Sequence, residues 1–224
     1  MQKLILVLLS ILMLGGCAGV QPSSKNAEGN KIISSSYPAA TFVIDDTFEL
    51  QGHRSGIDHG GTVSPTTSSS SSYTGEHFVY VDSGTGTWVD KIVAVSFLKL
   101  NKPRWTWERT PEWTGKSVIE GTIETRIGEL DTYTTFTRLP GLLDEYNLNL
   151  TSKNVHLCGA VVTMRQIPSG MARYKHSIDY MEPIRCSETD QFFYGDGSLT
   201  NTGRLRLERV FEHAQRDVRI YENR

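Results

Sequence analysis

The chain has 224 residues, of which 38% are hydrophobic and 21% charged, and its formal net charge at pH 7 is −2. This length suffices for one domain with a sizeable core. The mixed, slightly acidic charge excludes the concentrated basic surface that nucleic-acid binding requires, so we predict no nucleic-acid partner.

The first segment has the charge and hydropathy pattern of an export signal. One cation, Lys3, precedes an apolar run from Leu4 to Leu14, and small residues follow that run. A membrane-spanning anchor would need about 20 apolar residues, and the glycines after Leu14 end the run too early for that. An ordinary cleaved signal peptide is the other alternative.

The sequence Leu14-Gly15-Gly16-Cys17 resembles the lipobox of bacterial lipoprotein precursors. The resemblance implies that residues 1–16 are a removable signal peptide and that Cys17 is acylated, for example with palmitate, as the first mature residue. It therefore implies a protein held in the cell envelope by its lipid. Retained inner-membrane lipoproteins carry Asp after the cysteine, so Ala18 implies the outer membrane and a periplasm-facing domain.

Two polar stretches follow the cysteine. Residues 17–39 lack periodicity, so we predict the lipidated cysteine followed by a flexible tether. A single β-rich domain then occupies 40–224, with its first strand at 41–50. Gly, Ser, Thr and Pro dominate residues 52–75. Because this composition buries little apolar surface, we predict a disordered loop inside the domain.

Alternating apolar and polar residues predict most of the other strands. The segment 88–100 is apolar on both faces, which predicts a central strand covered on both sides. Turn residues between the segments predict antiparallel pairs. These pairs are 77–82 with 88–100, 117–127 with 132–138, and 154–166 with 172–180.

The last segment has helical periodicity. Its apolar residues recur at spacings of three and four and form one stripe, namely Leu207, Phe211, Ala214, Val218 and Tyr221. Together, the patterns predict an α+β fold: mainly an antiparallel sheet or sandwich of about seven strands with one C-terminal helix.

The chain has three cysteines. With Cys17 assigned to lipid, Cys158 and Cys186 remain as an even pair in a compartment that permits disulfides. A disulfide would contribute roughly 3 kcal/mol, and two buried free thiols are the alternative. If the turn after 154–166 centres on Ser169, Cys158 lies opposite Tyr180, so the bridge requires the chain to double back beyond Pro183.

Histidine and aspartate side chains are the candidates for catalysis or metal binding. His53, Asp58 and His59 lie in a glycine-rich stretch, and imidazole and carboxylate groups can bind zinc. Their spacing matches no known ligand signature. His176 lies on the tyrosine-bearing face of its strand, where it is a hydrogen-bonded core histidine, a ligand or a general base. No Gly-x-Ser-x-Gly nucleophile motif accompanies it.

Three tryptophans, Trp105, Trp107 and Trp113, lie in one Pro-containing segment. Trp105 and Trp107 project to the same side of an extended chain, as in an aromatic platform for a sugar or a protein partner. Alternatively, the three rings cap one end of the core.

These observations favour a non-enzymatic binding or structural role for a membrane-tethered envelope lipoprotein. Its partners would be the membrane, through lipid on Cys17, and another envelope protein or a glycan. We assign no catalytic residue, metal or cofactor. The alternative is an envelope hydrolase or metal-dependent enzyme that uses His53, Asp58, His59 or His176.

Overall fold

The structure is a computed structural model that describes residues 25–63, 68–102, 106–107, 117–146, 154–171 and 173–223. The predicted signal peptide, Cys17, Trp105 and Trp113 lie outside the described residues.

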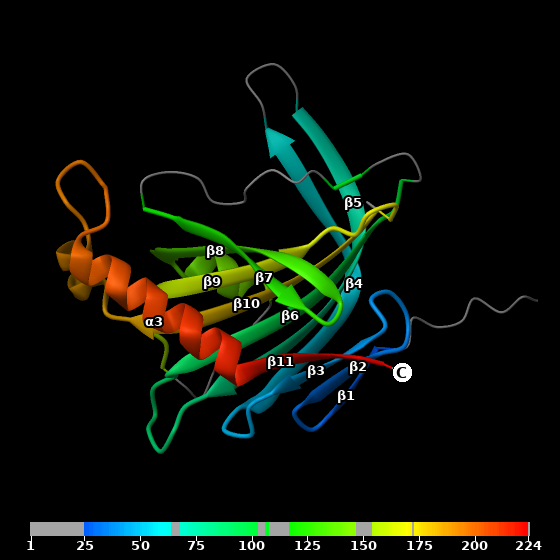
Figure 1. Ribbon diagram of the computed structural model, residues 1–224, viewed down its shortest axis with the longest axis horizontal. Coiled ribbons are helices and arrows are strands. Elements are labelled where there is room, and N and C mark those ends of the chain that lie inside the picture. Colours follow the sequence, from blue (N-terminus) through cyan, green and yellow to red (C-terminus); the bar gives the residue numbers. More distant parts are fainter. Residues whose placement is uncertain are drawn as a thin grey trace, which may run out of the picture.

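A large antiparallel sheet of seven strands forms the centre of the molecule (Figure 1). Its strand order is β4-β5-β6-β10-β9-β8-β7. The strands are β4 (Glu49–Val63), β5 (Ser68–Asp82), β6 (Lys91–Leu100), β7 (Ile119–Thr125), β8 (Gly128–Arg138), β9 (Cys158–Gln166) and β10 (Tyr174–Ile184). The two-faced apolar segment predicted to be central is β6, which lies between β5 and β10 and is buried along most of its length.

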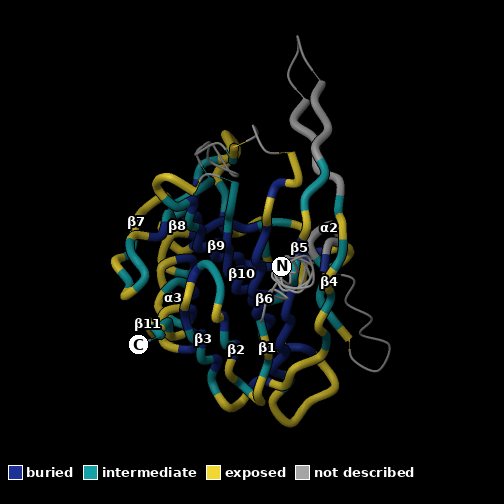
Figure 2. Tube along the Cα trace, turned by 90° about the vertical axis from the view of Figure 1, so that its right-hand side faces the viewer, coloured by how far each residue is buried: buried dark blue, intermediate teal, exposed yellow. Residues whose placement is uncertain are grey.

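A second, four-stranded antiparallel sheet and the helix α3 (Asn201–Asp217) cover one face of the large sheet. The small sheet has the order β1-β2-β3-β11. Its strands are β1 (Lys25–Glu28), β2 (Lys31–Ser34), β3 (Ala40–Ile44) and β11 (Val218–Glu222). Because β11 follows α3 directly, the helix and the small sheet lie side by side (Figures 1 and 2). The predicted α+β class, mainly antiparallel with one long C-terminal helix, is confirmed.

The main core lies between the large sheet and this covering layer. Phe42 of β3, Tyr80 of β5 and Leu207 of α3 all belong to one buried apolar cluster. A smaller cluster on the other face of the large sheet includes Val81 and Met181, and it packs under the loop after β5 and the short helix α2 (Pro140–Glu145). Two 3₁₀ turns, Cys186–Glu188 and Asp190–Phe192, connect β10 to α3. Both faces of the large sheet are therefore covered, as its two-sided apolar strands require.

The helix ends earlier than the apolar stripe predicted. Leu207, Val210 and Ala214 are buried on α3, but Val218 and Tyr221 belong to β11. From Val218 onward the chain pairs with β3, where β-branched and aromatic residues fit an extended strand better than a helix. The apolar residues of α3 and β11 thus keep a helical spacing of three and four only by coincidence, because the helix ends at Asp217.

Two segments predicted to be irregular are strands instead. Within the expected tether, β1 and β2 form a hairpin whose second strand pairs with β3, and Ile32 is fully buried. The expected loop at 52–75 coincides with parts of β4 and β5, which pair over almost their whole length. Low apolar content does not exclude strands, because paired strands satisfy their backbone groups by mutual hydrogen bonds.

The predicted disulfide is present: Cys158 and Cys186 are bonded, with an S–S distance of 2.09 Å. The predicted register was wrong, because Cys158 lies opposite Ile184 rather than Tyr180. The turn between β9 and β10 is longer than predicted, which shifts the partner of Cys158 by four residues. Cys186 follows two residues after Ile184, so the chain does not need to double back.

Candidate functional site

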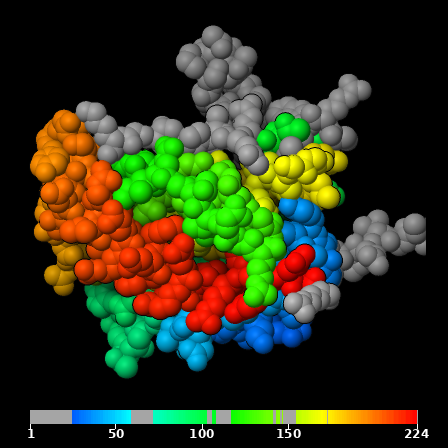
Figure 3. Space-filling model, viewed as in Figure 1, coloured from blue at the N-terminus to red at the C-terminus, as the bar shows by residue number. Residues whose placement is uncertain are grey.

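A groove of about 410 Å³ opens where the first strand of the small sheet meets one end of the large sheet. In Figure 3, N-terminal residues (blue) lie next to residues from the β9–β10 region (yellow) at this end of the molecule. The N-terminal wall comes from Lys25 and the turn residues 36–38. The opposite wall comes from the ends of three strands of the large sheet, with side chains that include Glu76, Phe97, Lys99 and Tyr174.

Strand periodicity places these side chains on the face of the sheet that lines the groove. In β10, Tyr174 precedes the core residues Ile178 and Tyr180 at even spacing, so it lies on the same face of the sheet. Register then brings neighbours together: Glu76 of β5 lies opposite Phe97 of β6, and Lys99 of β6 lies opposite Tyr174. On this face of the sheet, the side chains of each strand are therefore apolar in the core and polar at the end that lines the groove.

Three lysine ammonium groups lie over aromatic rings in or beside the groove. The Lys25 Nζ atom is 4.8 Å from the ring centre of Phe97, and the Lys99 Nζ atom is 5.6 Å from that of Tyr174. The Lys175 Nζ atom is 4.9 Å from the ring of Trp107. Each cation faces the negative side of a π system, which restricts where its ammonium group can lie.

Lys25 is partly buried in the groove. Burial lowers the pKa of its ammonium group; attraction to Glu76 raises it, and repulsion from Lys99 lowers it further. Its Nζ atom donates to the Ser36 hydroxyl at 3.2 Å. For Lys25, burial therefore outweighs the attraction to Glu76.

Glu76, the one carboxylate among the described lining residues, is engaged from its other side. The Nε2 atom of His53 lies 3.1 Å from its Oε1 atom. The ring of His53 stacks on Phe78 with centres 4.3 Å apart, which holds the imidazole at the edge of the sheet. His53 therefore orients Glu76, a role that its position in a glycine-rich stretch did not predict.

His176 lies in the core beneath this end of the sheet and is 1% exposed. Burial, and to a lesser degree the charge of Lys25, lowers the pKa of its imidazole to about 3. Neither of its ring nitrogens has a hydrogen-bond partner among the described residues. The ring lies near Phe42, with centres 6.2 Å apart. The core position predicted for His176 is confirmed, but the predicted hydrogen bond is not found among the described residues.

The other candidate ligands do not converge with His176. His53 lies opposite Phe78 in the ladder and Asp58 opposite Tyr73, so the two side chains point to opposite faces of β4. The side chain of His59 lies outside the described residues. Within the described part of the chain, no three His, Cys, Asp or Glu side chains are grouped as a metal ion would require.

Register creates a Ser–His–Asp arrangement on the opposite face of the sheet, which the sequence analysis missed. The Nδ1 atom of His77 is 2.8 Å from the Ser96 hydroxyl, and its Nε2 atom is 3.6 Å from Asp58 Oδ2. Arg54 pairs with the same aspartate. Ser96 is only 2% exposed on the central strand β6, where a substrate cannot reach its oxygen. The arrangement thus serves as buried polar packing.

Trp107 is the one predicted platform residue among the described residues. Its indole nitrogen donates to the carbonyl oxygen of Arg173 at 3.0 Å, and its ring contacts Tyr73 with centres 5.6 Å apart. Its half-buried ring therefore packs against the end of the large sheet.

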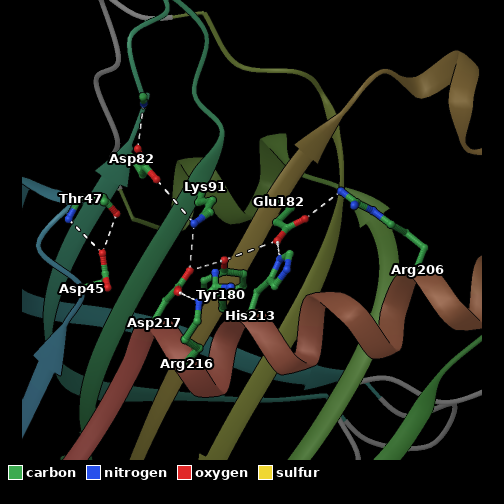
Figure 4. A network of polar contacts seen from close by, with 11 residues as sticks. Asp45, Thr47, Asp82, Lys91, Tyr180, Glu182, Arg206, His213, Arg216 and Asp217 are labelled. Carbon is green, nitrogen blue, oxygen red and sulfur yellow. Dashed lines mark hydrogen bonds and ion pairs between the residues drawn. The ribbon is translucent and has the colours of Figure 1, made fainter.

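A second polar cluster joins α3 to the large sheet (Figure 4). Glu182 of β10 accepts from Arg206 at 2.8 Å and lies 2.7 Å from the Nδ1 atom of His213, both on α3. At the end of the helix, Asp217 accepts from Lys91 of β6 at 3.1 Å and from Tyr180 of β10 at 2.9 Å. Because both carboxylates are nearly buried where the helix meets the sheet, this cluster holds the layers together.

No protein-family model, curated protein or solved structure matches the chain. In the described part of the chain, none of the helices has the length and hydropathy to cross a membrane. The groove is therefore identified as the candidate site from its geometry and its lining residues.

Proposed function

We propose that this protein is an outer-membrane lipoprotein, anchored through acyl chains on Cys17, whose periplasmic domain binds a ligand without catalysing a reaction. The observation that carries the proposal is the groove of about 410 Å³ lined by cationic and aromatic side chains. A concave site with a few convergent polar groups and aromatic walls is the usual form of a ligand pocket.

The position of Lys25 links the groove to the proposed anchor. Lys25 lines the groove and follows Cys17 by eight positions. Eight residues span at most about 29 Å when fully extended. If Cys17 carries lipid, the groove lies within this distance of the bilayer surface. The ligand would therefore be a component of the membrane surface or a molecule that reaches it.

The chemistry of the described residues favours binding over hydrolysis. The low pKa of His176 and its apolar neighbours make it a poor general base. Ser96 is hydrogen-bonded and buried rather than presented to a pocket. The groove, in contrast, is open and lined by groups that bind and orient a charged ligand.

Metabolic labelling with a palmitate analogue tests the anchor. We expect the wild-type chain to carry the label and the Cys17→Ala variant to carry none, because the thiol is the acylation site that the lipobox resemblance implies. The Cys186→Ala variant, which retains Cys17, serves as the control and should label like the wild type. Equal labelling of the Cys17→Ala variant would refute the anchor.

Photo-crosslinking in living cells tests the groove. A benzophenone side chain at position 101, where exposed Asn101 lines the groove, should capture a defined ligand. The same group at exposed position 31 on β2 is the control, because Lys31 does not line the groove. Adducts of equal identity and yield at both positions would contradict a binding site in the groove.

A further inference from the structure

We infer that the groove binds the phosphate group of its ligand between Lys25 and Lys99. This inference rests on the proposed function, because it names the class of ligand for the same groove. The feature that carries it is the pair of cations Lys25 and Lys99 in the groove, which form no ion pair with a carboxylate among the described residues.

Charge balance is the first argument. Lys25, Lys99 and Glu76 are charged residues that line the groove, and together they carry a formal net charge of +1. A phosphate monoester carries a charge of about −1.5 to −2 at pH 7. A single phosphate group would therefore supply the negative charge that the two lysines lack.

The arrangement of the cations is the second argument. Among the described residues, neither Lys25 nor Lys99 forms an ion pair with a carboxylate. The two lysines are close enough that Lys99 lowers the pKa of Lys25. Glu76 is engaged by His53 at 3.1 Å. An anion between the ammonium groups would replace their repulsion by two attractions.

The walls of the groove determine what else the ligand can carry. The rings of Tyr37 and Tyr174 lie 5.7 Å apart, and Phe97 lines the same groove. Aromatic walls of this kind contact apolar or flat groups. A phosphorylated lipid headgroup and a soluble phosphate ester share this chemistry, and the proximity to the proposed anchor makes the membrane surface the nearer source.

Calorimetric titration of the full acylated chain in non-ionic detergent tests the inference. The probes are glycerol 3-phosphate and dihexanoyl phosphatidic acid, which share a phosphate monoester. Dihexanoyl phosphatidylcholine controls for partition into the micelle. We expect saturable binding of at least one phosphate monoester. Tighter binding of the lipid by about tenfold or more assigns the source to lipid, and equal affinity assigns it to soluble esters.

Charge variants locate the phosphate group. Lys25→Gln and Lys99→Gln should each weaken binding about tenfold, because each removes one charge-assisted contact. Glu76→Gln should strengthen binding severalfold, because it removes a negative charge from the same groove. Lys31→Gln, which changes an exposed lysine outside the groove, should leave affinity unchanged. Circular dichroism checks that each variant is folded. If Lys25→Gln unfolds, Lys99→Gln decides the test, because Lys99 is exposed and its replacement should not disturb the fold.

Two results would overturn the inference. One is an absence of saturable binding to both monoesters, and the other is binding that survives in both the Lys25→Gln and Lys99→Gln variants. Crosslinking at position 101 that excess monoester does not displace would overturn it while leaving the proposed binding function in place. If crosslinking at that position also fails, the groove is not a ligand site.

Discussion

At the scale of single residues, Asp217 shows how a buried charge is stabilised. Its side chain is 2% exposed and lies at the junction of α3 with the large sheet. Burial raises the pKa of this carboxyl group, but hydrogen bonds from Arg216, Lys91 and Tyr180 outweigh burial and hold it below the usual 3.8. The Tyr180 hydroxyl shows the reverse effect, because burial and two nearby carboxylates raise its pKa.

The substitution Asp217→Asn should lower the free energy of unfolding by about 3 kcal/mol at pH 7, because it leaves buried donors without their anion. The folded-state pKa lies below the unfolded one, so the ionised carboxylate stabilises the fold above about pH 4. This contribution is lost as the pH falls through the folded-state pKa. Urea denaturation at pH 7 and pH 3 should show the wild-type advantage shrinking in acid.

The exposed turn residue Asp46 supplies the control for this measurement. Asp46→Asn should change stability by less than about 0.5 kcal/mol at either pH. An Asp217→Asn deficit that stays constant from pH 7 to pH 3 would contradict the assignment of the effect to the ionised carboxylate.

At the scale of elements, the docking of α3 depends on its first turn. Thr200 is the N-cap residue, and its hydroxyl accepts from the Gly203 backbone N–H at 3.1 Å. Gly203 packs directly on the preceding 3₁₀ turn, where a Cβ atom would lie only 2.4 Å from the carbonyl oxygen of Phe192. The helix therefore needs glycine here for close approach, although glycine is a poor helix former.

Two opposing effects decide the outcome of Gly203→Ala. Alanine favours the helix by about 1 kcal/mol over glycine. The contact with a backbone oxygen forces the helix to shift, and overpacking costs about 1–3 kcal/mol or more. Because 2.4 Å is far inside van der Waals contact, we expect a net loss of at least about 1 kcal/mol in urea denaturation.

Gly195 provides a matched comparison, because a Cβ atom there would meet no atom within 4 Å. Gly195→Ala should be neutral to within about 0.5 kcal/mol. A Gly203→Ala variant as stable as the wild type would show that the helix does not depend on this close approach.

At the scale of the whole molecule, the two sheets and α3 share one apolar core. Polar contacts reinforce this layer packing. The Tyr80 hydroxyl of the large sheet donates at 3.1 Å to the carbonyl oxygen of Gly29, in the turn between β1 and β2 of the small sheet. Burial raises the pKa of that hydroxyl to about 12. Neither layer can separate without exposing the shared cluster, so the described domain should unfold as one unit.

Cooperative unfolding can be checked with two spectroscopic signals. Far-ultraviolet circular dichroism reports the strands and the helix, and near-ultraviolet circular dichroism reports the packed tyrosines and tryptophans. We expect both signals to give the same urea midpoint under non-reducing conditions. Loss of the near-ultraviolet signal at a lower urea concentration would show that the layers come apart before the secondary structure melts.

Local sequence patterns predicted those elements in which burial and periodicity agree. The two-faced apolar segment became the central strand β6, and the stripe of Leu207 and Ala214 became the buried side of α3. The prediction failed where backbone pairing rather than burial stabilises the chain, as in the serine-containing strand β5. It also failed at Val218, where the spacing of apolar residues fits a helix and the small sheet imposes a strand.

The candidate site also could not be predicted from local sequence patterns. Lys25, Lys99 and Tyr174 come from distant parts of the chain, and none stands out in its local sequence. The sequence alone determined the lipobox resemblance, the fold class and the even pair of cysteines, because these depend on composition and on local order. Only the tertiary structure decided which strands are neighbours and in which register. Alternation specifies the face on which a side chain lies, whereas a groove or a disulfide also requires the right neighbour across the sheet.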